Sequence, residues 1–284
     1  MIVIKIGGGG GLDLAACRAD VARLRAAGEA VVVVHGGSEG ATALGEALGH
    51  PPHFLTAPSG VRSRYTDART LDIFTMACAR LNARLVAGLQ GLDVRAVGLS
   101  GLDGRILVGR RKEAVVTVED GRRRVVRDDR SGTVEAVNAS LLRALLDAGY
   151  VPVVSPPAWS PDGSINVDAD RAAALVARAL DAETLVLLTN VPGLLRDRDD
   201  PASLIERVAE HDIDDAMNVA AGRMRVKLLA ARAAVGGGVA RVIIADGRRD
   251  RPVARALEGG GTTIVRRPAP ANAGLALAYA GAQS

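Results

Sequence analysis

Short apolar strands alternate with helices along most of the chain, and this alternation restricts the fold more strongly than any other feature. The strands over residues 2–6 and 30–37 both run into glycines and are followed by helical segments. A helix between two strands returns the chain to the same end of the sheet, so such strands pair in parallel. The sequence therefore predicts an α/β fold in which helices sandwich a mostly parallel open sheet.

Residue periodicity and turn residues place the remaining elements. Strands are predicted at 2–6, 30–37, 94–101, 150–157, 184–190, 241–245 and 262–265, and helices at 13–27, 38–49, 66–91, 139–148, 168–181 and 222–235. Two β-hairpins interrupt the alternation, one over 113–129 with a Glu-Asp-Gly turn and one that turns at 161–163. They make the sheet a mixed one. Residues 266–284, rich in proline and alanine, are expected to form a flexible tail.

The composition excludes several classes of protein. Aromatic residues make up 2% of the 284 residues, too few for the stacking platforms that bind single-stranded nucleic acids. The two cysteines, Cys17 and Cys78, lack metal or redox spacing and are expected to be buried free thiols. The N-terminal apolar run is too short for a secretion signal, and no apolar stretch reaches the length of a membrane span. We expect a cytoplasmic protein.

Lysine is rare, and its positions are informative. Of 36 lysines and arginines, only Lys5, Lys112 and Lys227 are lysine. Lys5 stands in an apolar strand directly before glycines, where a charge needs an explanation. Backbone amides at the end of such a strand point away from the sheet and bind phosphate groups. A second strand–glycine junction at residues 35–38 favours the same interpretation, although each junction alone would be consistent with a simple tight turn.

Common nucleotide-binding motifs do not account for these junctions. The P-loop pattern is absent. A Rossmann fingerprint would need a glycine where Leu12 stands and an acid where His35 stands. Any phosphate site in this chain must therefore be of another kind.

Three charged positions are candidates for a site next to the glycines. Asp168 in the stretch "INVDAD" is expected to cap a helix, and Asp170 either supports that cap or faces inward to organise cations. Lys227 lies on a helix close to apolar residues. Arg64 lies in a Gly/Ser loop before a helix capped by Thr66 or Asp67, and its planar guanidinium suits a carboxylate.

Taken together, these stretches resemble the amino acid kinase family. The stretches "KIGGG", "VVHGG", "RYTD", "INVDAD", "LLTNVPGL" and "GRMRVK" occur in the family's order and spacing, over about residues 1–265. The chain resembles the acetylglutamate kinase branch. Its segment "GHPPHFLTAPSGVRSRYTD" and its arginine-rich hairpin resemble more closely the kinases of aminoadipate carried by the small acidic protein LysW. A fifth glycine and the C-terminal extension depart from the pattern.

The resemblance implies that a phosphoryl group passes from ATP, with Mg²⁺, to a side-chain carboxylate and forms an acyl phosphate. The implied acceptor is α-aminoadipate linked through its amino group to LysW, a step of lysine biosynthesis. Some relatives also accept LysW-linked glutamate, for arginine biosynthesis. An N-acetylglutamate kinase and a non-catalytic amino-acid or nucleotide sensor remain alternatives. The family further implies a homodimer formed through an acceptor-binding N-terminal lobe (1–180), with ATP bound by a C-terminal lobe (181–265).

The resemblance also implies roles for single residues. Lys5 and Lys227 would stabilise the transferred phosphoryl group from opposite sides, and Asp170 would hold both lysines. The other implied positions are glycines that bind phosphate (Gly7, Gly8, Gly36, Gly37), acceptor ligands (Gly36, Gly37, Arg64, Asn166) and residues of the nucleotide-binding lobe (Thr189, Asn190, Gly193). No side chain is assigned as a metal ligand.

Positive charge is concentrated in one segment. Between Arg110 and Arg130, eight basic residues face five acidic ones, which accounts for three of the four net positive charges of the chain. Such a surface steers an acidic partner during association. We expect Arg122, Arg123 and Arg124 to dock the acidic carrier; the alternative is a solvated hairpin without a partner.

Overall fold

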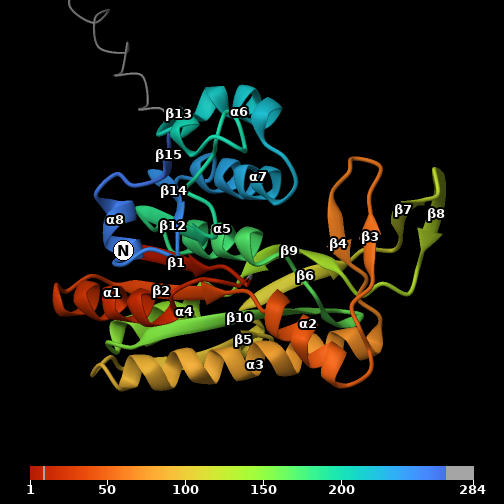
Figure 1. Ribbon diagram of the computed structural model, residues 1–284. Coiled ribbons are helices and arrows are strands. Elements are labelled where there is room, and N and C mark those ends of the chain that lie inside the picture. Colours follow the sequence, from red (N-terminus) through yellow and green to blue (C-terminus); the bar gives the residue numbers. More distant parts are fainter. Residues whose placement is uncertain (9, 267–284) are drawn as a thin grey trace, which may run out of the picture.

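The computed structural model describes residues 1–8 and 10–266 and confirms the α/β fold (Figure 1). The strands of the main sheet are β1 (Ile2–Ile6), β2 (Val31–His35), β5 (Ala96–Gly101), β6 (Leu107–Arg111), β9 (Gly132–Val137), β10 (Val151–Ser160), β11 (Gly163–Ile165), β12 (Thr184–Thr189), β13 (Arg207–Ala209), β14 (Arg241–Asp246) and β15 (Thr262–Val265). Their order is β13-β15-β14-β12-β1-β2-β10-β6-β9, and β5 and β11 also pair with β10. The central pairs are parallel, whereas β14–β15, β10–β11 and β6–β9 are antiparallel.

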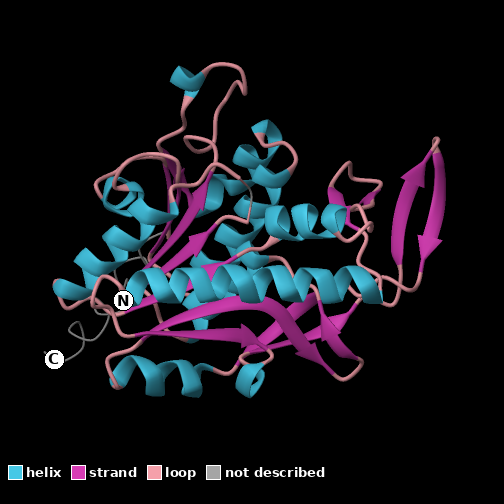
Figure 2. Ribbon diagram, turned by 60° about the horizontal axis from the view of Figure 1, so that its bottom comes forward, coloured by secondary structure: helices cyan, strands magenta, loops and turns pink. Residues whose placement is uncertain are grey.

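Helices cover both faces of this sheet (Figures 1 and 2). They are α1 (Leu14–Ala26), α2 (Ser38–Ala47), α3 (Ala68–Gln90), α4 (Ala139–Asp147), α5 (Ala169–Ala179), α6 (Ile213–Val219), α7 (Arg223–Val235) and α8 (Pro252–Leu257), with 3₁₀ turns at Asp103–Arg105, Pro201–Ser203 and Glu210–Asp212. One apolar core joins the sheet to α5 and α7, and the other joins it to α1, α3 and α8. Both faces of the central strands are therefore buried, which is the usual arrangement of parallel sheets covered by helices.

The two-residue period of β1 decides where Lys5 points. Ile2, Ile4 and Ile6 belong to the core shared with α1 and α3, whereas Val3 belongs to the core shared with α5 and α7. Side chains alternate along a strand, so Lys5 shares the face of Val3. The only charged residue of β1 therefore points toward the helices α5 and α7.

Two hairpins lie outside the main sheet. They consist of β3 (Phe54–Thr56) with β4 (Arg62–Arg64), and of β7 (Val115–Glu119) with β8 (Arg122–Val126). The second was predicted and is confirmed: its turn residues Asp120 and Gly121 both have positive φ, 49° and 74°. This suits a hairpin turn between twisted strands. The β7–β8 hairpin extends away from the sheet in both views (Figures 1 and 2).

Every predicted helix and strand is present, with ends that differ by a few residues, but several short elements were not predicted. The prediction of a loop around Arg62 and Arg64 is wrong, because these residues form β4, paired through Thr56↔Arg62 and Phe54↔Arg64. The strands β6, β9 and β13 and the helices α6 and α8 were also missed. Short elements of this kind depend on their neighbours more than on their own propensity. Asp67, and not Thr66, caps α3 by accepting a hydrogen bond from the Thr70 N–H at 2.7 Å.

Four further expectations concern the cysteines, the C-terminal tail, membrane-spanning helices and the division into lobes. Cys17 and Cys78 are buried free thiols, as predicted. The expected tail, residues 266–284, lies outside the described residues except for Arg266. Judged by length and apolar content, none of the helices within residues 1–8 and 10–266 could span a bilayer. The division into lobes at residues 180 and 181 stays a prediction.

Candidate active site

The two glycine junctions meet at the carboxyl edge of the sheet. β1 and β2 are parallel neighbours, with Ile6 opposite His35, so the chain leaves both strands at the same place. The Gly36 N–H donates to the Ile6 carbonyl at 3.1 Å. A Cβ atom on Gly8 would lie 2.7 Å from the Gly37 nitrogen, and one on Gly7 would lie 3.1 Å from the Leu188 carbonyl oxygen. Only glycine allows the two backbones to approach this closely.

Next to the glycines, one buried carboxylate lies between two lysines. The Lys5 Nζ is 2.7 Å from Asp170 Oδ1, and the Lys227 Nζ donates to Asp170 Oδ2 at 2.8 Å. All three residues are at most 7% exposed. Three elements distant in sequence, β1, α5 and α7, each supply one member. The structure thus brings together the three residues that the sequence singled out for the centre of the site.

Local sequence explains how each member is held. Asp168 caps α5 as predicted, since its Oδ1 accepts a hydrogen bond from the Arg171 N–H at 2.9 Å. This places Asp170 in the first turn, where it faces inward rather than supporting the cap. Lys227 lies one turn inside α7, beside the buried Leu228.

The charges of the cluster shift the pKa values of Asp170 and Lys227. Burial by itself raises the pKa of the Asp170 carboxyl, but the charges of Lys5 and Lys227 outweigh burial and hold this pKa below its ordinary value. Burial lowers the pKa of Lys227, as does the charge of Lys5, whereas Asp170 opposes both effects. Lys5, Lys227 and Asp170 by themselves form a cluster of two cationic groups and one carboxylate, which suits an anion. The Asp168 carboxyl lies close to this cluster, and burial together with the charge of Asp170 raises its pKa.

The predicted acceptor ligands, Arg64 and Asn166, lie on segments that contact each other. Arg64 Nη2 donates to the Ser38 carbonyl at 2.9 Å and to Thr42 Oγ1 at 2.7 Å, both on the helix that follows Gly37. Burial lowers the pKa of Arg64, and the charge of Arg223 at the start of α7 lowers it further. The Asn166 side chain donates to Thr66 Oγ1 at 3.1 Å.

The predicted nucleotide-binding residues follow β12. Thr189 ends this strand, which is parallel to β1 with Leu188 opposite Ile6, so the loop begins at the same sheet edge as the glycines. Asn190 is exposed there. A Cβ atom on Gly193 would lie 2.6 Å from Thr262 Oγ1, so glycine is required for this approach.

A buried histidine was missed as part of the site. His35 is fully buried, its Nδ1–H donates to the Gly36 carbonyl at 3.0 Å, and its Nε2 accepts from Asn82 Nδ2 at 3.2 Å. Burial lowers the pKa of His35 to about 4, so the ring is neutral at neutral pH. Its hydrogen bond to the Gly36 carbonyl helps to fix the backbone of the Gly36–Gly37 turn. A lone polar residue in the run "VVVVH" was the available signal.

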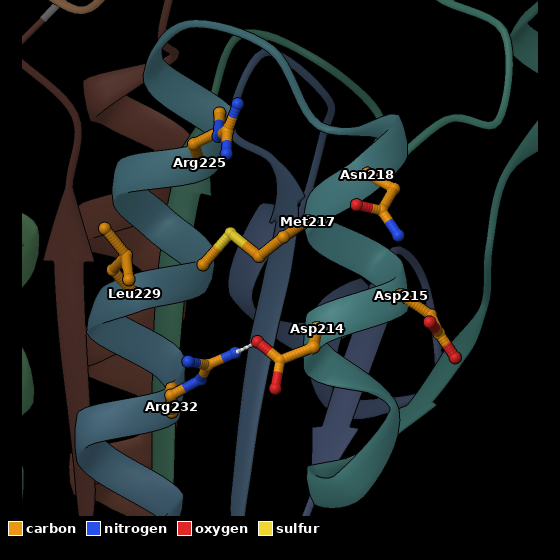
Figure 3. Close-up of a pocket in the computed structure, with 7 residues that line it drawn as sticks. All are labelled: Asp214, Asp215, Met217, Asn218, Arg225, Leu229 and Arg232. Carbon is orange, nitrogen blue, oxygen red and sulfur yellow. Dashed lines mark hydrogen bonds and ion pairs between the residues drawn. The ribbon is translucent and has the colours of Figure 1, made fainter. Parts of the chain in front are cut away.

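A hollow elsewhere in the structure contains none of the predicted site residues. It has a volume of about 430 Å³ and lies between α6 and α7, where Asp214, Met217, Asn218, Arg225 and Leu229 are among its lining residues (Figure 3). An ion pair between Arg232 and Asp214 closes one end (Figure 3). Lys227, in contrast, points from α7 toward α5.

Among the described residues there is no cluster of three or more His, Cys, Asp or Glu side chains suited to a metal ion.

Residues 1–246 match the sequence pattern of the amino acid kinase family. The chain belongs to the amino acid kinase family. Within this family, the [LysW]-aminoadipate kinase of Deinococcus radiodurans is 53% identical over 266 residues, which cover 93% of this chain and 91% of that relative. The [LysW]-aminoadipate kinase of Thermus thermophilus is 50% identical, covering 93% and 100%. The [LysW]-aminoadipate/[LysW]-glutamate kinase of Saccharolobus islandicus is 34% identical, covering 93% and 99%.

A solved structure shares the fold of this amino acid kinase family member. The N-acetylglutamate synthase of Neisseria gonorrhoeae, in complex with coenzyme A and N-acetylglutamate, superposes with a TM-score of 0.76 at 30% identity. The superposition covers 94% of this chain, which spans only 60% of the length of the synthase. The family resemblance and the mixed, mostly parallel sheet predicted from the sequence are both confirmed.

Proposed function

We propose that this chain is an ATP-dependent kinase that phosphorylates the side-chain carboxylate of α-aminoadipate linked to the carrier protein LysW, in lysine biosynthesis. The phosphoryl-transfer part rests on one observation: two ammonium groups held 2.7 and 2.8 Å from one buried carboxylate beside two glycine turns. The choice of acceptor is supported by the two relatives at 53% and 50% identity. LysW-linked glutamate is a further acceptor, supported by a relative at 34% identity.

The chemistry requires positive charge rather than a base. A carboxylate acceptor with an ordinary pKa near ~4.3 is already ionised at neutral pH. Lys5 and Lys227 stabilise the negative charge on the phosphoryl oxygens during transfer, and Asp170 keeps both ammonium groups in position. The Lys5 Nζ lies 2.7 Å from Asp170 Oδ1. This pairing uses one of the three N–H groups of the Lys5 ammonium, so the other two remain available to a phosphoryl oxygen.

The remaining residues bind the two substrates. Amides of Gly7, Gly8, Gly36 and Gly37 bind phosphate oxygens without interference from side chains. Arg64 and Asn166 bind the acceptor on the N-terminal lobe, residues 1–180. Thr189, Asn190 and Gly193 belong to the ATP-binding lobe, residues 181–265. Mg²⁺ bound with ATP would neutralise part of the phosphate charge, and the enzyme works in the cytoplasm, where ATP is available.

We place the docking surface for LysW on the β7–β8 hairpin. The strand register distinguishes the three arginines that we expect to dock the carrier. Arg124 lies opposite Thr117, and Arg122 opposite Glu119, so both share the face that packs on β3. Arg123 lies on the other face with Val116 and Val125, which are 39% and 56% exposed. Arg124 is also paired with Glu119 at 2.6 Å. Arg123 is therefore the most available of the three for an acidic partner.

The test is an assay of acyl phosphate formation in which three acceptors are compared in separate incubations. The purified chain is incubated with ATP, Mg²⁺ and either LysW-linked aminoadipate, LysW-linked glutamate or free N-acetylglutamate, and hydroxylamine converts any acyl phosphate to a hydroxamate. We expect LysW-linked aminoadipate to react fastest, and the Asp170→Asn variant to be inactive. Faster reaction of N-acetylglutamate would replace this proposal with the arginine-pathway kinase. If none of the three acceptors is phosphorylated but ATP or an amino acid still binds, the non-catalytic sensor would replace this proposal.

A further inference from the structure

Asp129 is a buried carboxylate to which the phosphoryl-transfer chemistry assigns no role. It is 2% exposed, although it follows the exposed Asp128 at the end of the β7–β8 hairpin. Its Oδ2 accepts a hydrogen bond from the Thr66 N–H at 2.9 Å, and its Oδ1 accepts one from the Ser131 N–H at 2.7 Å. Both oxygens therefore serve backbone groups of two different segments. Hydrogen bonds to a charged acceptor are about twice as strong as neutral ones.

The two segments tied by Asp129 are those that hold the proposed acceptor ligands. Thr66 lies two residues after Arg64, and the Arg130 N–H donates to the Thr66 carbonyl at 2.6 Å. Thr66 Oγ1 in turn accepts the hydrogen bond from the Asn166 side chain at 3.1 Å. The Gly132 N–H donates to the Asn166 carbonyl at 2.9 Å. Asp129 thus lies at the centre of a network that joins Arg64 to Asn166.

The same network connects to the hairpin. The Arg111 side chain donates to the Asp129 carbonyl at 2.8 Å and fixes the base of the hairpin on β6. Farther out, Thr117 Oγ1 is fully buried and bonds to both backbone groups of Thr56, at 3.1 and 3.2 Å. The strand that ends with Arg64 pairs with the strand that ends with Thr56. The two hairpins therefore form one hydrogen-bonded unit.

We propose that Asp129 is a positioning residue for the acceptor: it sets the relative placement of Arg64 and Asn166 and links them to the β7–β8 hairpin. It acts through Arg64 and Asn166 and touches no reacting atom. The inference rests on the proposed function for the identity of the acceptor. Its structural part, the tie between the hairpin and the segment 62–66, can be tested without any substrate.

The kinetic test uses Asp129→Asn with Asp128→Asn as the matched control. Asparagine has the same shape but leaves one of the two backbone N–H groups without an acceptor. We expect the KM for LysW-linked aminoadipate to rise by about tenfold or more, because small misplacements of binding groups are costly, while the KM for ATP changes by less than about twofold. Asp128 bonds to the exposed Tyr65 hydroxyl, where water can substitute, so its variant should keep both KM values.

A double-mutant cycle separates positioning from general destabilisation. If Asp129 acts through Arg64, the Asp129→Asn change should raise the acceptor KM much less in an Arg64→Ala background than in the wild type. The inference would be overturned if the acceptor KM of the double variant rose by the product of the two single-variant increases. It would also be overturned if Asp129→Asn raised the KM values of ATP and the acceptor equally.

Hydrogen exchange provides a readout that needs no acceptor. In the free Asp129→Asn protein, the amides of residues 62–66 should exchange faster than in the wild type, while those of α1 should be unchanged. Unchanged exchange at 62–66 would refute the tie itself. If the wild type does not phosphorylate LysW-linked aminoadipate but exchange at 62–66 accelerates, the proposed function fails and the positioning role stands.

Discussion

At the scale of single residues, the buried charge of Lys5 is explained by its partner. Lys5 lies in a strand whose other residues are aliphatic, and taking an ammonium group out of water costs several kcal/mol unless it is paired. Asp170 on α5 supplies the opposite charge, and Lys227 adds a second positive charge, so these three side chains together carry one excess positive charge. A buried excess charge lowers the stability of the fold but favours the binding of an anion.

The first prediction concerns the two lysines. Lys5→Ala and Lys227→Ala should each lower kcat by ~10²–10³ or more, the scale found when one charge-stabilising donor is removed. Each variant should remain folded, because Asp170 keeps the other ammonium group as a partner. Steady-state assays with circular dichroism check both points. Lys112→Ala, the third and exposed lysine, is the control and should be unchanged. Near-normal turnover of either site variant would contradict the two-lysine mechanism.

The second prediction concerns pH and His35. Its pKa is lowered by burial from 6.5 to about 4, so the unfolded chain takes up a proton at a higher pH than the native state. This group therefore adds nothing to the pH dependence above 6.5, and it reduces the free energy of unfolding as pH falls from 6.5 to about 4. The full loss would be about 3 kcal/mol.

Urea unfolding at pH 7.5, 6 and 4.5 measures this effect in the wild type and in His35→Gln. Glutamine can accept the Asn82 hydrogen bond but does not titrate in this range. The stability difference between the two proteins should shrink as pH falls. Parallel pH profiles would mean that the pKa of His35 is the same in the native and the unfolded state, which would contradict the effect of burial.

At the scale of elements, the β7–β8 hairpin combines different surfaces on its two faces. One face is held on β3 by Thr117. The other face presents the exposed Val116 and Val125 beside Arg123. Opposite residues in an antiparallel pair share a face, so the register decides which arginines a partner can meet.

The third prediction follows from this register. Arg123→Ser should slow the phosphorylation of LysW-linked aminoadipate more than Arg124→Ser, because Arg124 is already paired with Glu119. Changing Arg122, Arg123 and Arg124 together should also flatten the dependence of kcat/KM on ionic strength, since steering by charge is screened by salt. Turnover of the carrier-linked substrate measured at low and high salt checks this. An unaffected triple variant at low salt would exclude the hairpin as the docking surface.

At the scale of the whole molecule, α3 lies along one face of the sheet (Figure 1). Met76 on this helix is 49% exposed. A large exposed apolar side chain on a 23-residue helix is a suitable contact for a second copy of the chain. The family resemblance implies a homodimer through this part of the chain, residues 1–180.

The fourth prediction is therefore a dimer in solution. Sedimentation equilibrium should give twice the mass of the 284-residue chain, and Met76→Glu should shift the protein toward monomer. Leu229→Glu, at a similarly exposed position of 40% on α7, should leave the mass unchanged. A monomeric wild type would contradict the expectation of a homodimer.

Local patterns in the sequence were sufficient for part of this description. Strand and helix periodicity identified the sheet, the β7–β8 turn and the capping role of Asp168, because these depend on neighbours a few residues apart. The motifs also identified Lys5, Asp170 and Lys227 as residues of one site. The resemblance also implied that Asp170 holds both lysines. The geometry and the burial of these side chains come from packing between distant elements, since Lys227 and Asp170 are 57 residues apart in the sequence.

Long-range contacts account for what the sequence left open. The strand β4 forms because Arg62 and Arg64 pair with Thr56 and Phe54, and no local propensity marks that pairing. The ring of His35 is held by the Asn82 side chain, which is 47 residues away in the sequence. Asp129 could not be distinguished from Asp128 by sequence, because burial separates them: one accepts two backbone hydrogen bonds and the other faces solvent. Local sequence thus sets most of the longer helices and strands, whereas short strands such as β4 and the burial and pairing of charges arise only when distant segments pack together.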